Sequence, residues 1–171
     1  GIPAALRAGG ATVYTPPVSA LNSSELRGEQ LLAQLRQLKA AHGHARFHLI
    51  GHSHGGPTAR YVAAVAPELV ASVTTIGAPH RGSKVADGVE AQTGATGTTG
   101  LVAAIVDAMG VAISWLSGSP TLPQNSLATL GSLNTRGAEA FNARFPQGAP
   151  TTACGDGPGL AKKCAILGAA T

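Results

Sequence analysis

A serine stands between two histidines in the stretch GHSHG, residues 51–55, which fits the pattern G-x-S-x-G. The stretch follows an apolar run and opens a segment of helix formers. A sharp turn from strand to helix in this setting lifts a serine hydroxyl above the edge of a sheet, where it can act as a nucleophile. Glycines two residues before and two residues after the serine leave room for neighbouring backbone. Ser53 is therefore the candidate nucleophile.

The residue after this serine supplies a second candidate group. The backbone N–H of His54 would lie at the helix start and face the negative charge that develops on an attacked carbonyl oxygen, which makes it a candidate oxyanion donor. The imidazoles of His52 and His54 are not expected to act as the base, because side chains that flank such a serine point away from it. The alternative is an ordinary glycine-rich turn with a serine at the helix N-cap.

Strand patterns surround this turn. Three runs of β-formers or apolar residues predict strands, at 11–15, at 46–50 with its end at Gly51, and at 70–76. The strand at 46–50 is expected to be buried. Because helical patterns separate the strands, we expect parallel pairing with helices on the faces of the sheet, which is an α/β fold in a single domain over residues 1–171.

Two helices are predicted between the strands. The first spans 22–43, with N-cap candidates at its start and Gly43 at its end. Its leucines fall on one face that should pack on the sheet, namely Leu31, Leu35 and Leu38. The second spans 54–69, where Pro67 marks its end or a break.

A strongly apolar segment lies between two loop-like stretches. Residues 93–100 are rich in Gly and Thr, 118–125 are loop-like, and 101–116 read LVAAIVDAMGVAISWL between them. The pattern predicts a helix with a very wide apolar face, which is either core or a cover. The segment is shorter than a bilayer requires and contains Asp107.

Composition limits the classes of function. The chain is 44% hydrophobic and 12% charged, so it should bury a core. The net charge is +4, but the basic residues are scattered, so we expect no nucleic-acid partner. No residue set suits a structural zinc site. Cys154 and Cys164 could form a disulfide or be unrelated thiols. The chain starts at Gly1 and carries no signal-peptide pattern.

Four stretches make the pattern more specific: RGEQLL, HLIGHSHGGPTARYVAAVAPELVASVTTIGAPHRGS, QNSLATLGSLNTRGAEAFNARFPQG and TTACG. They resemble the secreted, foldase-dependent true lipases of Pseudomonas and Burkholderia, over residues 1–155. The resemblance implies an α/β-hydrolase fold, hydrolysis of long-chain triacylglycerols at a lipid–water interface, Ser53 as nucleophile, secretion, a lipase-specific foldase as partner and structural calcium. No cofactor is expected to bind to residues of this chain itself.

The resemblance also implies a helical lid in the region of about 93–125. The apolar 101–116 helix would cover the active site and be favourable to expose at an oil surface, since each buried Leu or Ile is worth about 1.5 to 3 kcal/mol. The residues expected to gate substrate entry are Leu101, Ile105, Met109, Ile113, Trp115 and Leu116.

A serine hydroxyl needs a histidine as base and a carboxylate to orient that histidine, in the chain order Ser, Asp or Glu, His. Asp87 is the first aspartate after Ser53, and no histidine follows it in this sequence. Glu68 with His80 satisfies the order, but the resemblance implies that His80 is not the base, because the family does not use the histidine of this stretch in that role. Asp87, Asp107 and Asp156 are expected to be surface or capping residues.

The family's Asp, His and calcium ligands fall beyond residue 171, and its second oxyanion donor falls before residue 1. We therefore expect a central fragment, incomplete at both ends, whose 171 residues alone are nearly inactive. The tail 156–171 has no match to the family. Cys154 corresponds to a family cysteine with a distant partner, and Cys164 stands in the wrong context for that partner.

Two other functions remain open from the sequence. The substrate could be a short-chain soluble ester, with the lid merely structural. Alternatively, the chain could be a non-catalytic, lipid-adsorbing fragment that lacks the triad Asp and His.

Overall fold

The computed structural model describes residues 1–96 and 121–148, with side chains up to residue 91 and again from 121. The expected lid helix at 101–116, the two cysteines and the 156–171 tail lie outside this range. So do all six residues named for the lid, which are Leu101, Ile105, Met109, Ile113, Trp115 and Leu116. Within the described ranges no helix is both long and apolar enough to span a bilayer.

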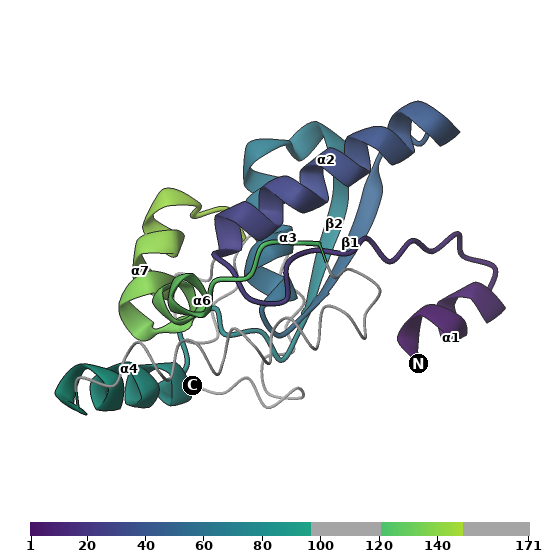
Figure 1. Ribbon diagram of the computed structural model, residues 1–171. Coiled ribbons are helices and arrows are strands. Elements are labelled where there is room, and N and C mark those ends of the chain that lie inside the picture. Colours follow the sequence, from purple (N-terminus) through teal and green to yellow (C-terminus); the bar gives the residue numbers. More distant parts are fainter. Residues whose placement is uncertain (97–120, 149–171) are drawn as a thin grey trace.

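A parallel strand pair forms the centre of the described structure (Figure 1). Strand β1 spans Phe47–His52 and β2 spans Val70–Ile76. Their register aligns Gly51 with Thr75, so both strands end at the same edge. Helix α3, Gly55–Val65, and the short 3-10 helix η1, Pro67–Leu69, connect them. The predicted strand–helix–strand unit is confirmed, and Pro67 ends the longer helix because its ring cannot continue one.

The expectation that β1 is fully buried is wrong. Leu49 and Gly51 are buried, whereas the alternate positions face outward and Ile50 is 47% exposed. Successive side chains of a strand point to opposite faces of the sheet. Within the described chain, helices α2 and α3 cover one of these faces, so only alternate residues of β1 are buried.

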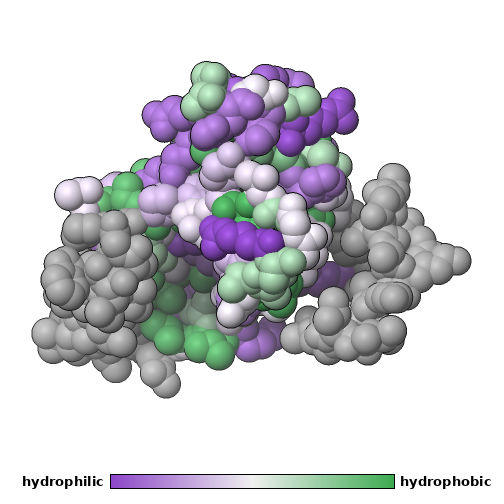
Figure 2. All heavy atoms as spheres, turned by 90° about the vertical axis from the view of Figure 1, so that its right-hand side faces the viewer, coloured by the Kyte–Doolittle hydropathy of each residue, from purple (hydrophilic) through white to green (hydrophobic). Residues whose placement is uncertain are grey.

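Helix α2 spans Ser24–His42 and agrees with the predicted helix at both ends. The Ser23 side chain accepts a hydrogen bond from the Leu26 N–H at the N-terminus. Gly43 ends the helix in the left-handed conformation, φ 71°. The C-terminal end of α2 lies at the top of Figure 1. Figure 2 shows the molecule turned by 90° about the vertical axis, and its top is mainly hydrophilic.

The apolar face of α2 packs mainly against α3, and its Leu32 and Leu35 also share one core with Leu49 of β1, as the expected packing toward the sheet requires. Gly28 allows this approach, because a Cβ there would lie 2.7 Å from the ring carbon Cγ of Tyr61. The core has buried members from both helices, β1 and η1: Leu32, Leu35, Leu49, Ala59, Val62, Ala66 and Leu69. Leu31 and Leu38 are only partly buried at its margin.

Four further helices complete the described structure: α1 (Ile2–Ala8), α4 (Lys84–Thr96), α6 (Ser126–Leu133) and α7 (Thr135–Arg144). Helix α4 extends into the 93–100 stretch that was expected to be a loop. Asn125 and Asn134 cap α6 and α7 through their side-chain oxygens. Asp87 accepts hydrogen bonds from the N–H and hydroxyl of Thr135, 2.7 Å each, which confirms its expected capping role.

The predicted strand at 11–15 is wrong, because the structure has no regular secondary structure there. A strand needs a neighbour for its backbone groups, and the described chain places none beside this segment. Side chains hold it instead: Arg7 donates to the Val13 carbonyl, and the Tyr14 hydroxyl lies 2.8 Å from His44 Nε2.

Candidate functional site

Ser53 occupies a tight turn between the end of β1 and the start of α3. Its φ is +52°, and among the described residues no other non-glycine residue has a positive φ. Backbone hydrogen bonds fix the turn: the Ser53 N–H donates to the Ile76 carbonyl (3.0 Å), and the Gly56 N–H donates to the Ser53 carbonyl (2.9 Å). The side chain is exposed. A strained, exposed serine at the end of a parallel strand is the geometry that the motif predicted.

Two glycines make room for this turn. A Cβ on Gly51 would lie within 3.0 Å of the Gly55 carbonyl group and 2.7 Å from the Gly56 nitrogen. A Cβ on Gly56 would lie within 3.0 Å of the Ala78 Cβ. A Cβ on Gly55 would meet no atom of the described residues within 4 Å. The second glycine required for space is therefore Gly56, and the expectation that Gly55 has this role is wrong.

His54 is buried at the start of α3, and its ring faces α2. Its Nε2 lies 2.9 Å from the Ser24 hydroxyl. Burial, together with the nearby charge of Arg27, lowers the pKa of His54 to about 3, so the ring is neutral near pH 7. Its backbone N–H donates to no group in the described part of the chain. That N–H is therefore able to donate a hydrogen bond to a ligand oxygen.

Both ring nitrogens of His80 are engaged by groups other than Ser53. Its Nε2 lies 3.0 Å from the Thr75 hydroxyl, and its Nδ1 lies 3.4 Å from an Arg60 nitrogen. Burial and then the Arg60 charge lower the pKa of His80 to about 4. Glu68 is exposed in η1 and makes no hydrogen bond to His80. These contacts give no support to a Glu68–His80 pair acting on Ser53.

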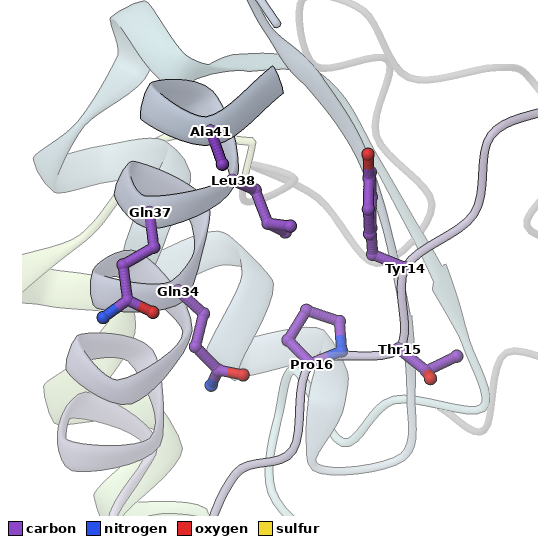
Figure 3. Close-up of a pocket in the computed structure, with 7 residues that line it drawn as sticks. All are labelled: Tyr14, Thr15, Pro16, Gln34, Gln37, Leu38 and Ala41. Carbon is purple, nitrogen blue, oxygen red and sulfur yellow. The ribbon is translucent and has the colours of Figure 1, made fainter. Parts of the chain in front are cut away.

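A cavity of about 300 Å³ is separate from this turn (Figure 3). One wall is formed by Tyr14, Thr15 and Pro16, and the other by Gln34, Gln37, Leu38 and Ala41 of α2. Leu38 lies fourteen residues after Ser24, or about 20 Å along the helix. The cavity is therefore distant from the Ser24–His54 contact. No group of three potential metal ligands lies within the described ranges.

The arrangement suits nucleophilic attack on a carbonyl carbon. The Ser53 hydroxyl is exposed at the N-terminal end of α3, and the neighbouring His54 N–H has no partner among the residues that the structure describes. Helix N-termini favour negative charge, as on a tetrahedral oxyanion. The contact between Ser24 and His54 was not predicted from the sequence, because the two residues lie thirty positions apart and only the fold brings them together.

Comparisons with known proteins agree with this geometry. A family model described as the alpha/beta hydrolase fold matches residues 2–167. Three relatives are triacylglycerol lipases. One from Vibrio cholerae is 51% identical, and the match covers 92% of this chain and 51% of the relative. One from Pseudomonas fragi is 48% identical, and the match covers 92% of this chain and 54% of the relative. A third, from Burkholderia plantarii, is 46% identical, and the match covers 88% of this chain and 44% of the relative.

The chain thus spans about half the length of the curated relatives that it matches. Among solved structures, a Bacillus licheniformis lipase in its propeptide form aligns with a TM-score of 0.51 and 23% identity, over 74% of this chain and 23% of that one. This likeness concerns the fold. Together with the parallel strands and the turn at Ser53, the family match over nearly the whole sequence shows that the chain belongs to the α/β-hydrolase fold family.

Proposed function

We propose that the protein is a triacylglycerol lipase in which Ser53 is the nucleophile. The observation that carries this proposal is the turn itself: an exposed serine with φ +52° between a parallel strand and a helix, in a chain about half identical to triacylglycerol lipases. A short-chain esterase would use the same turn, but the similarity to lipases favours long-chain substrates.

In the proposed reaction the Ser53 Oγ attacks the ester carbonyl carbon and forms a tetrahedral intermediate. The hydroxyl proton passes to a histidine outside the described residues, and the His54 N–H donates a hydrogen bond to the oxyanion. The C–O bond then breaks, the proton goes to the leaving diacylglycerol, and an acyl-enzyme remains. Water attacks the acyl-enzyme with the same base, which releases the fatty acid and restores the Ser53 hydroxyl.

The wider setting of this activity is part of the proposal. The resemblance to foldase-dependent lipases supports a lipid–water interface as the site of action, secretion, and a foldase as partner. The apolar sequence 101–116 supports a role of its residues in gating substrate. The resemblance also supports structural calcium, with its ligands outside this sequence.

The experiment is labelling with an alkyl p-nitrophenyl phosphonate, on protein produced from its full natural coding sequence. The phosphonate should attach at Ser53 with release of p-nitrophenol, and Ser53→Ala should abolish both labelling and hydrolysis of emulsified triolein. Ser72→Ala is the matched control, since it removes another exposed serine, on β2, and should leave both intact.

Two results would contradict the proposal. Retained triolein hydrolysis in Ser53→Ala would exclude Ser53 as the nucleophile. Turnover of soluble p-nitrophenyl butyrate without turnover of emulsified triolein would exclude the lipase assignment and favour an esterase.

A further inference from the structure

We propose that Ser24, at the start of α2, is a positioning residue that holds the His54 backbone N–H in place for catalysis. This inference rests on the proposed function, since it concerns the oxyanion donor of that same reaction. It adds a residue thirty positions upstream, on a different element. Ser24 would touch neither substrate nor reacting atoms, and would act only through His54.

The contact itself is buried and directional. The Ser24 Oγ lies 2.9 Å from His54 Nε2, with Ser24 1% exposed and His54 7% exposed. The other ring nitrogen, Nδ1, has no partner in the described part of the chain. The contact to Ser24 is therefore the hydrogen bond that fixes the ring's orientation, and water does not compete for it.

A second connection from α2 holds the same residue by its carbonyl group. The Thr58 hydroxyl donates to the His54 carbonyl (2.9 Å), and Arg27 Nε donates to that hydroxyl (3.2 Å). Arg27 is itself buried and fixed by the carbonyls of Ser19 and Ala20. The first turn of α2 thus holds His54 at both its side chain and its backbone.

This fixation matters because of the strain next to it. Ser53 has a left-handed backbone, which costs about 1 to 3 kcal/mol for a residue other than glycine and persists only where surrounding contacts enforce it. Rotation of the Ser53 backbone out of its left-handed conformation would relieve the strain and move the His54 N–H away from the oxyanion. The Ser24 contact resists this rotation, because the buried ring would have to move with the backbone.

The test compares two adjacent serines of the same helix start. Ser24→Ala removes the contact to His54, while Ser23→Ala removes the N-cap of α2 and leaves that contact intact. Both should lower the midpoint of urea unfolding. Rates are divided by the number of sites titrated with the phosphonate, so that misfolded protein does not count.

We expect Ser24→Ala to lower kcat per titrated site by roughly 5- to 30-fold with KM within about twofold. Loss of a whole oxyanion donor costs about 100- to 1000-fold, and misplacement costs part of that. Ser23→Ala should keep kcat within about twofold. Equal kcat per site in the two variants would show that Ser24 is merely structural and would overturn the inference.

A second pair of variants approaches the contact from its other side. His54→Gln places an amide near the Nε2 position, whereas His54→Met has similar length and no hydrogen-bonding group. We expect kcat per titrated site to be higher in His54→Gln than in His54→Met, by roughly the factor that Ser24→Ala loses, and the Ser24→Ala/His54→Met double variant to lose no more than His54→Met alone. Equal kcat for Gln and Met would overturn the inference even if Ser24→Ala does not fold.

The outcome for Ser53 separates the two proposals. If the phosphonate labels Ser53 and the Ser24 variants behave like their controls, the positioning role fails and the lipase assignment stands. If Ser53 is not labelled, both fall together.

Discussion

Gly51→Ala and Gly55→Ala add the same methyl group at the two glycines of the G-x-S-x-G pattern, and we expect opposite effects on the free energy of unfolding. At Gly51 the new Cβ would overlap the Gly55 carbonyl group and lie 2.7 Å from the Gly56 nitrogen. These are backbone atoms at the start of α3, so no side chain can rotate away. At Gly55 the new Cβ would have no neighbour within 4 Å in the described part of the chain, and the residue lies in helix α3.

The magnitudes follow from this difference. Ordinary contacts of a Cβ begin near 3.4 Å, so Gly51→Ala must displace the start of α3 from β1. Overpacking of this kind costs about 1 to 3 kcal/mol, and the rigid neighbours at Gly51 favour the upper end. Gly55→Ala should stabilise by about 0.4 to 1 kcal/mol, because alanine restricts the unfolded chain. The two variants should therefore differ by about 3 kcal/mol or more.

The assay is the free energy of unfolding from urea denaturation of the two variants and the parent protein. Phosphonate titration of the folded protein adds a second measurement, since displacement of α3 should slow labelling of Ser53 only in Gly51→Ala. A Gly51→Ala protein as stable as Gly55→Ala would refute the packing argument, and with it the account of why the turn contains these glycines.

Three further predictions concern the same framework. His54 is neutral when folded, since its pKa is about 3, but titrates near 6.5 when unfolded. Acidification from pH 7 to 5 should therefore reduce the contribution of His54 to the unfolding free energy by about 2 kcal/mol, and urea titrations of His54→Gln should lack this component while that of His80 remains. Hydrogen bonds from Thr135 hold the pKa of Asp87 below its usual range, so the melting temperature of Asp87→Asn should lie below the parent's at pH 7 and approach it as the pH falls below about 4. Gly28→Ala should destabilise by about 1 to 3 kcal/mol in urea, because its Cβ would overlap the Tyr61 ring; a neutral effect would contradict the close packing of α2 on α3.

Local signals allowed part of this structure to be predicted. Helix α2 was placed correctly because serine at its start and Gly43 at its end satisfy backbone groups within the same segment. The turn at Ser53 could be predicted for the same reason, since its geometry depends on a strand, a helix start and nearby glycines. Asn125 and Asn134 also have a residue type that favours helix N-caps, so the starts of α6 and α7 are encoded locally as well.

The errors arose where an element depends on a distant partner. The β-formers at 11–15 indicate a strand only if another strand pairs with them, which a single segment cannot reveal. The need for glycine at position 56 depends on Ala78, which lies beyond the next strand. The Ser24–His54 contact depends on how α2 docks on α3, and no local pattern encodes it.

The start of α3 limits how this protein can be made more heat-resistant. Two neighbouring features lower stability, namely the left-handed backbone of Ser53 and a buried nitrogen of His54 that has no partner within the described ranges. Substitutions that relieve either one would raise the melting temperature and alter the geometry on which the proposed chemistry depends. Stabilising changes that spare turnover should therefore be sought elsewhere, such as at the exposed apolar side chains of Val85 and Leu127.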